Sequence, residues 1–208
     1  MSGSDVNVRS TKRLRLRRFA PDDVDTLHAL DSDPRVMRYI GDGRTSCRDE
    51  TQAAIDRILA RYRDHPGQGV WHASRRDDGR FVGWVSLKHA GDSPDIEIGY
   101  RLVHDAWGQG FATELARAMV VRGFEVLGLT RIIGVTHPDN LASQRVLRKI
   151  GMRDEGWGRY YDQDRDCSRW IAATVPPLNG PRTGRDGGRA TRVAPSTTSP
   201  ARVPDVSR

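Results

Sequence analysis

The sequence predicts a mixed α/β domain, in which about seven strands form a mostly antiparallel sheet and about four helices flank it. Three observations lead to this fold class. Strand-like alternation and helix-like periodicity follow one another in the order β-α-α-β-β-β-α-β-α-β-β. An Asp78-Gly79 pair marks a tight hairpin between two of the three consecutive strands. One strand-helix-strand unit follows, and the regular alternation of a doubly wound nucleotide-binding fold does not occur.

The first elements are one strand and two helices. Leu14 and Leu16 alternate with arginines, which predicts a strand with one wet face. The segment APDDVDTLHALDSDP (20–34) predicts a helix, because proline suits a first turn and acidic residues suit the positive end of the helix dipole. A second helix is expected over about 49–65, where apolar residues recur on one side and Pro66 ends the pattern.

The remaining elements follow from the same two periodicities. Strands are expected at 70–76, 80–89, 94–103, 131–137, 152–161 and 167–174, and helices at about 110–127 and 140–151. Asn140 is expected to cap the last helix, and Gly151 to follow its end.

Composition divides the chain into a folded domain (12–175) between a flexible N-terminus (1–11) and a disordered basic tail (176–208). The tail is largely Pro, Gly, Ser, Thr and Arg, so it cannot bury enough apolar surface to offset its ordering entropy. Its six arginines and two aspartates give +4 of the net charge of +7. The +3 that remains is ordinary, which argues against nucleic acid as a main partner.

Residue types that mark compartments or metal sites are sparse. Cys47 and Cys167 lie far apart without metal-ligand spacing, which favours a reducing cytosol and predicts neither a disulfide nor a metal site. The N-terminus has no apolar signal core, and no segment approaches the length of a membrane span. A soluble cytoplasmic protein without a membrane or metal partner is therefore expected.

The segment VHDAWGQGFATELARAMV (103–120) passes from a strand end through a glycine loop into a helix. A dinucleotide-binding loop would need a third glycine where Thr113 stands, and a Walker loop would need a lysine that the segment lacks. Gly108 and Gly110 let the backbone turn its N–H groups toward a ligand, and the helix start adds free donors and a positive dipole end. These residues alone leave two interpretations, a metal-free pyrophosphate site and a tight turn that binds nothing.

Two motifs together resemble the GNAT superfamily of acyl-CoA-dependent N-acetyltransferases, and within it the RimJ/RimL-like group. WGQGFATEL (107–115) resembles the family's phosphate loop, although Trp107 stands where Gln or Arg is usual. NLASQRVLRKIGM (140–152) follows at the family's spacing. Three further segments resemble the same group, namely LRLRRFAPDDVDTL (14–27), IEIGYRL (96–102) and GMRDEGWGR (151–159). The likeness covers about residues 12 to 175.

The resemblance implies direct transfer from acetyl-CoA to an amine, and it assigns the CoA contacts. Backbone groups of Leu102 and Val103 would meet the pantetheine and thioester, where a bulge splays their strand from the next. Asn140 would contact the pantetheine arm, a role compatible with capping its helix. Phe111 and Leu115 are expected to face the core. The pyrophosphate would bind the loop formed by Gly108, Gln109, Gly110, Phe111, Ala112 and Thr113.

The resemblance also implies a catalytic base and a catalytic acid. Glu97 would take the proton of the amine through water, and its alternative is a solvated strand carboxylate. Ser143 would protonate the departing thiolate, because Leu147 stands where many relatives carry a tyrosine. The alternative for Ser143 is an ordinary hydroxyl on a helix surface. If Ser143 does not act as the acid, Tyr160 and Tyr161 are the next candidates for this role.

The acceptor is expected to be a primary amine, either a protein N-terminus or a small molecule, selected by residues of about 36–70 and 158–168. The acidic turn DQDRD (162–166) would attract a cationic amine, unless it is simply solvated. All six histidines are expected at the surface or at strand ends, with only His104 near the thioester. A non-catalytic acyl-CoA sensor or interaction module remains the alternative function, and a homodimer is compatible with these expectations.

Overall fold

The computed structural model describes residues 10–158 and 167–173, with only the course of the backbone for 157–158 and 167–173. All of these residues belong to one compact unit of the chain, Met1–Pro176. Most of the predicted flexible N-terminus, the acidic turn with Tyr160 and Tyr161, and the predicted tail lie outside the described residues.

The sheet is mixed and confirms the predicted fold class. Seven strands pair in the order β1-β2-β3-β4-β5-β7-β6. Every neighbouring pair is antiparallel except β4 and β5, which are parallel. The strands are β1 (Leu14–Arg18), β2 (Gly69–Arg75), β3 (Phe81–His89), β4 (Ile96–Leu102), β5 (Arg131–Thr136), β6 (Arg153–Gly158) and β7 (Cys167–Ala173).

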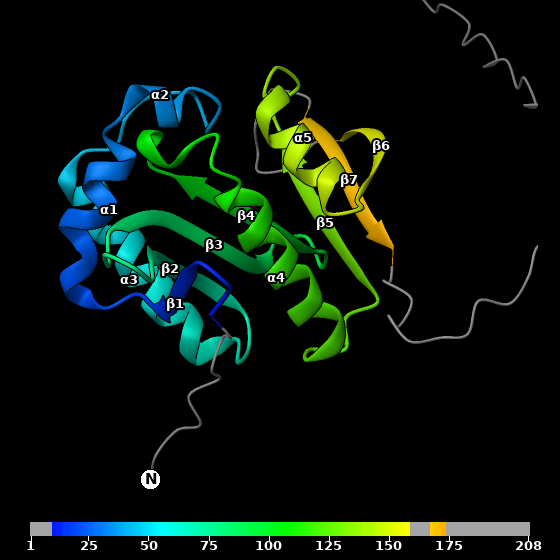
Figure 1. Cartoon of the computed structure of the whole chain (residues 1–208), viewed down its shortest axis with the longest axis horizontal. Coiled ribbons are helices and arrows are strands. Elements are labelled where there is room, and N and C mark those ends of the chain that lie inside the picture. The colour runs from blue at the N-terminus through cyan, green and yellow to red at the C-terminus, as the bar shows by residue number, and fades with distance from the viewer. Residues whose placement is uncertain (1–9, 159–166, 174–208) are drawn as a thin grey trace, which may run out of the picture. The chain divides into compact units, whose positions relative to one another are not determined.

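Helices cover both faces of this sheet (Figure 1). α4 and α5 pack on one face, where their apolar residues join those of β4 and β5, and α1 and α3 pack on the other. The four predicted helices are present as α1 (Val24–Asp31), α3 (Arg48–Asp64), α4 (Phe111–Glu125) and α5 (Leu141–Lys149).

Three short helical turns were not predicted as separate elements. Pro21–Asp23 forms a 3-10 turn, so α1 begins later than proline alone suggests, and His104–Ala106 forms a second such turn, η2. The third is α2 (Pro34–Met37), whose start has a local cause. The Asp33 side chain accepts a hydrogen bond from the Arg35 amide, and proline suits the first helical position.

The core between the sheet and α4 is closely packed. Leu115 and Met119 of α4 are fully buried, and burial of such a side chain contributes about 1.5–3 kcal/mol. Gly123 allows α4 to lie close to β5, because a Cβ there would come within 2.5 Å of the Ile132 Cδ1 atom. As expected, Phe111 is also buried in this core.

The expectation that all six histidines lie at the surface or at strand ends is wrong for His72. This residue lies in the middle of β2 with a side chain that is almost fully buried. The rings of Phe19 and Phe81 pack against it, with centroids 5.6 and 4.6 Å away. Burial lowers the pKa of His72 to about 4, so the imidazole is neutral near pH 7.

Among the described residues, no helix is long and apolar enough to cross a membrane.

Candidate active site

The candidate site is a cleft that opens where β4 and β5 part. The two parallel strands pair in register only at Glu97 and Ile133. Beyond this point they diverge, and a cleft of about 1250 Å³ is lined by both strands and by residues of α3, α4 and α5. This gap in the sheet gives access to β4 from both of its faces.

Alternation along β4 divides its side chains between the two faces of the sheet. Ile98 and Leu102 face α4 and α5 and join their apolar core. Arg101 faces the opposite side, where its guanidinium pairs with Asp31 of α1 at 2.6 Å. Glu97 has the same parity as Arg101, so it lies on the side of α1 and α3. Ligands that enter from the two faces can therefore meet in the gap.

The loop before α4 presents backbone N–H groups to the cleft. Gly108 and Gly110 are left-handed, with φ of +73° and +80°, a conformation that disfavours other residues. No side chain caps α4, and the amides of 108–113 have no acceptor among the described residues. Of this loop, all the predicted residues except Gln109 line the cleft.

Arg13, beside β1, fixes the shape of this loop. Its guanidinium donates to the Gln109 carbonyl at 2.9 Å and to the Glu114 carboxylate at 2.7 Å. It also lies 4.5 Å from the centre of the Phe111 ring. Sequence reasoning missed this residue, because the partners are about a hundred positions away in the chain.

The backbone groups predicted to meet the thioester have partners of their own. The Leu102 carbonyl accepts a hydrogen bond from the indole Nε1 of Trp107 at 2.9 Å. The Val103 N–H donates to the Val82 carbonyl at 3.1 Å, and so faces β3 rather than the gap. Leu102 lines the cleft and Val103 does not. Because backbone direction alternates along a strand, the N–H groups of Tyr100 and Leu102 are those directed toward the gap.

Glu97 is a buried carboxyl group at the narrow end of the gap, with a side chain that is 7% exposed. Burial raises the pKa of Glu97 to about 7, although the charge of Lys88 and a hydrogen bond from the Val135 amide lower it. Lys88 lies opposite Glu97 in the register of β3 and β4. The alternative of a solvated strand carboxylate is therefore wrong for Glu97.

On the other face, Ser143 of α5 and Tyr100 of β4 bridge the gap. The Tyr100 hydroxyl lies 3.0 Å from Ser143 Oγ, and it donates to the Ser143 carbonyl at 3.1 Å. Burial raises the pKa of Tyr100, so the phenol keeps its proton at neutral pH. Ser143 is thus not an ordinary surface hydroxyl. Sequence reasoning missed Tyr100, although its even parity on β4 points it toward α5.

Asn140 caps α5 as predicted, since its Oδ1 accepts a hydrogen bond from the Ser143 amide at 3.0 Å. Its side-chain amide lies at the cleft. Leu147 is buried against Gly134 of β5. A Cβ on Gly134 would come within 2.9 Å of the Leu147 Cδ2 atom. Arg145 and Lys149, one turn apart on α5, also line the cleft and add positive charge to it.

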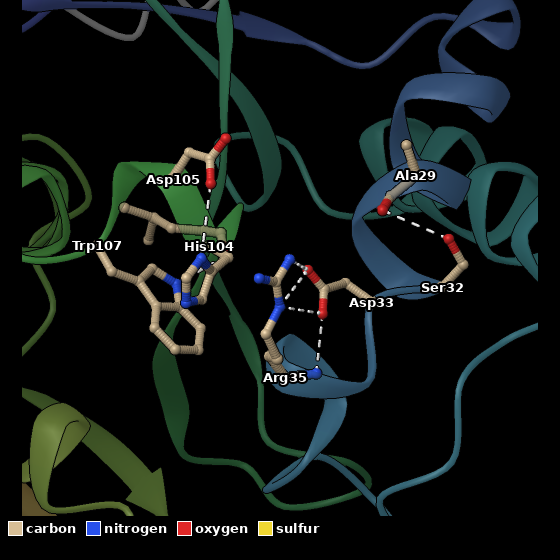
Figure 2. Close-up of polar contacts among 8 residues, drawn as sticks. Ala29, Ser32, Asp33, Arg35, His104, Asp105 and Trp107 are labelled. Carbon is tan, nitrogen blue, oxygen red and sulfur yellow. Dashed lines mark hydrogen bonds and ion pairs between the residues drawn. The ribbon is translucent and has the colours of Figure 1, made fainter.

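Two segments that are distant in the sequence meet beside the cleft, as Figure 2 shows. The Arg35 guanidinium pairs with Asp33 at 2.6 Å, and it lies between Asp33 and the rings of His104 and Trp107. The hydrogen bonds from Arg35, with a smaller effect of nearby His104, lower the pKa of Asp33 to about 2. His137 lines the cleft and His104 does not, and that only His104 lies near the thioester stays a prediction.

Comparison with known proteins decides the family. Residues 13–153 match the acetyltransferase (GNAT) domain model. The chain is 34% identical over 155 residues to the uncharacterized N-acetyltransferase YoaA of Bacillus subtilis, covering 74% of this chain and 87% of that protein. This chain belongs to the GNAT family. It is an acetyl-CoA-dependent N-acetyltransferase of the RimJ/RimL type.

Solved GNAT structures share its fold. RimL, the ribosomal L7/L12 alpha-N-protein acetyltransferase solved with coenzyme A, superposes with a TM-score of 0.67 at 17% identity, covering 80% of this chain and 97% of RimL. Spermidine N-acetyltransferase of Vibrio cholerae, solved with CoA and spermine, gives 0.62 at 18% identity, covering 77% and 95%. Proteins of this fold thus act on acceptors as different as a protein N-terminus and a polyamine.

Proposed function

We propose that this GNAT enzyme acetylates a primary amine, on a small molecule or a protein N-terminus, by direct attack within a ternary complex. One observation carries the proposal. A buried carboxyl group and a hydroxyl pair lie on opposite faces of β4, at the point where β4 and β5 separate. This arrangement suits a reaction in which one partner loses a proton on one face and the other gains one on the second face.

The cleft has the chemistry needed to hold CoA. The unpartnered amides of 108–113 and the start of α4 suit a pyrophosphate, and Arg145 and Lys149 suit its negative charge. Nothing lies within 4 Å of a Cβ built on Gly108, so a ligand has room above this loop. Asn140 and the N–H groups of Tyr100 and Leu102 would bind the pantetheine.

Glu97 is proposed as the base. A carboxylate whose pKa lies near 7 can accept a proton at physiological pH, and it is a stronger base than an exposed glutamate. Its place on the side of α1 and α3 means that the amine would approach from that face. Glu97 would take the ammonium proton directly or through one water molecule.

Ser143 and Tyr100 are proposed as the acid. Acetyl-CoA supplies the thioester, so that an N–C bond forms as the C–S bond breaks. Ser143 would give its hydroxyl proton to the sulfur. The Tyr100 hydroxyl would then turn its own proton from the Ser143 carbonyl to Ser143 Oγ, 3.0 Å away, and replace the one lost. The nitrogen then loses a second proton, which returns through water to Tyr100 and restores both hydroxyl groups. The products are an amide and a free thiol, and one proton is left on Glu97.

The alternative is an acyl-CoA sensor that binds CoA without turnover. An assay of acetyl-CoA with a panel of amines, following free thiol and acetylated product together, separates the two. Thiol release that depends on the amine supports the transferase. CoA binding without amine-dependent release from any amine would favour the sensor.

A further inference from the structure

The side of the cleft that faces α3 carries an excess of positive charge. Its described charged residues comprise five bases and three acids, namely Arg44, Arg57, Arg61, Lys88 and Arg101 against Asp31, Glu50 and Glu97. This is the side on which Glu97 would meet the amine. The charges there should therefore reflect the chemistry of the acceptor.

Two of the three acids are already neutralised by arginines. Arg101 pairs with Asp31 at 2.6 Å, and Arg44 pairs with Glu50 at 2.6 Å. Glu97 is the remaining acid, and its proposed role is to accept the proton of the reacting amine, so it does not pair with a second ammonium group. Among the described lining residues, no further carboxylate remains for the second ammonium group of a polyamine.

Two of the cations have no such neutralising partner. Arg57 and Arg61 lie one turn apart on α3, line the cleft, and form no ion pair with any described residue. Burial lowers the pKa of Lys88, and the charge of Arg61 adds to this effect, so Arg61 lies within electrostatic reach of the Lys88–Glu97 pair. The buried Nε of Arg101 also lacks an acceptor.

Gly99 of β4 lines the cleft between Glu97 and Arg101 and has no side chain to fill it. A Cβ on Gly99 would come within 2.7 Å of Ser86 Oγ, so no other residue fits there without displacement. Gly99 lies between Glu97 and Arg101 on the strand and has their parity. A small molecule resting on Gly99 would lie between Glu97 and Arg101 along β4, in the cleft that Arg57 and Arg61 also line.

We infer that the acceptor is a small amine bearing a carboxylate, held by Arg57 and Arg61 while its amino group faces Glu97. Charge-assisted hydrogen bonds from guanidinium to carboxylate are strong and directional. This inference rests on the proposed transferase function and narrows its substrate class. It separates the enzyme from polyamine acetyltransferases of the same fold.

The test compares amines matched in length but not in charge. 4-Aminobutyrate, 4-aminobutanamide and 1,4-diaminobutane form one set, and β-alanine, its amide and 1,3-diaminopropane form another. We expect kcat/KM to be about 10 to 100-fold higher for the carboxylate than for the amide. The amine of the amide is less basic, so a larger fraction of it is unprotonated and ready to react. This difference favours the amide, so a preference for the carboxylate would be significant. Calorimetric binding to the enzyme–CoA complex should give the same order.

Variants locate the effect. Arg57→Gln and Arg61→Gln should bring the carboxylate-to-amide ratio toward one, and Arg61→Lys should keep part of it. Arg63→Gln is the matched control, since Arg63 lies on α3 outside the cleft. Equal or greater turnover of the diamine or amide, or an unchanged ratio in the Arg57 and Arg61 variants, would overturn the inference while leaving the transferase standing. Absence of thiol release with every amine would overturn both.

Discussion

We propose that the proton transfers of this enzyme are divided between groups on the two faces of β4, with Glu97 on one face and the Tyr100–Ser143 hydroxyl pair on the other. Glu97 owes its raised pKa to burial, and Lys88 keeps it from rising further. Burial raises the pKa of Tyr100 as well, so the phenol is protonated at neutral pH and can donate a hydrogen bond. The roles proposed for positions along β4 differ because alternation places their side chains in different surroundings.

The pH dependence of activity should report Glu97. With an acceptor whose amine stays protonated throughout, kcat/KM should rise with pH through an apparent pKa of about 7, because Glu97 acts only when ionised. Glu97→Gln should lower kcat/KM by about 10² to 10⁴-fold and abolish this limb. Asp92→Asn, in an exposed turn, is the control. A limb that persists near pH 7 in Glu97→Gln would assign it to another group.

The hydroxyl pair makes a separate prediction. Ser143→Ala should lower kcat by roughly 10 to 10⁴-fold with acetyl-CoA affinity nearly unchanged. Tyr100→Phe should lower kcat as well, and the double variant should lose less than the product of the two, because both residues serve one transfer. Ser32→Ala, which removes an exposed hydroxyl outside the cleft, should be neutral (Figure 2). A silent Ser143→Ala would contradict the assignment.

At the scale of elements, the loop of 108–113 that we propose binds the pyrophosphate is held in shape by contacts within the protein. Two left-handed glycines turn its amides toward the cleft, and Arg13 ties the loop to α4 and to the start of β1. A loop that is already ordered loses little conformational entropy when it binds. Near the adjoining turn η2, Arg35 of α2 pairs with Asp33 and lies within electrostatic reach of Asp105.

Gly110→Val should remove the stabilisation that acetyl-CoA confers. A ligand at a hundredfold excess over its Kd stabilises the native state by about 2.7 kcal/mol, seen as a rise in Tm. A β-branched residue at a left-handed position is strained by about 1–2 kcal/mol, and its side chain would crowd the pyrophosphate. Gly128→Val is the matched control, because Gly128 is also left-handed, at φ +64°, but lies outside the cleft. Equal ligand-induced shifts in both variants would contradict the site.

Across the whole molecule, two buried groups make opposite contributions to the pH dependence of stability. His72 has a folded pKa of about 4, below its unfolded value, so its contribution is present above about pH 6.5 and is lost as pH falls toward 4. Glu97 has a folded pKa of about 7, above its unfolded value, so its contribution is present below about pH 4.5 and is lost as pH rises through 7. Each amounts to about 3 kcal/mol.

Substitution should expose each contribution in turn. In His72→Phe, acidification from about pH 6.5 to 4.5 should cost less stability than in the wild type, because the histidine term is gone. In Glu97→Gln the same acidification should cost more, because the opposing term is gone. Denaturant titrations across this range measure both, and parallel profiles for the three proteins would contradict the prediction.

The tail is proposed to be dispensable for catalysis. Its composition cannot form a core, and the family match ends before it. A chain truncated after Pro176 should keep its kcat/KM within tenfold, as measured by thiol release. A larger loss in a truncated protein that retains its fold would refute this. Salt-dependent RNA retention that disappears with the tail would instead assign the tail a separate binding role.

The sequence by itself determined the local elements and the glycine loop before α4. Helix and strand periods, the left-handed Gly108 and Gly110, and the Asn140 cap are signals contained in a few neighbouring residues. The tertiary structure decided what lies between elements. It places β7 between β5 and β6, ends the pairing of β4 with β5 near Glu97, and brings the Tyr100 hydroxyl to Ser143. These features depend on register and packing between segments far apart in the chain, and a period of two along one strand does not specify its partner.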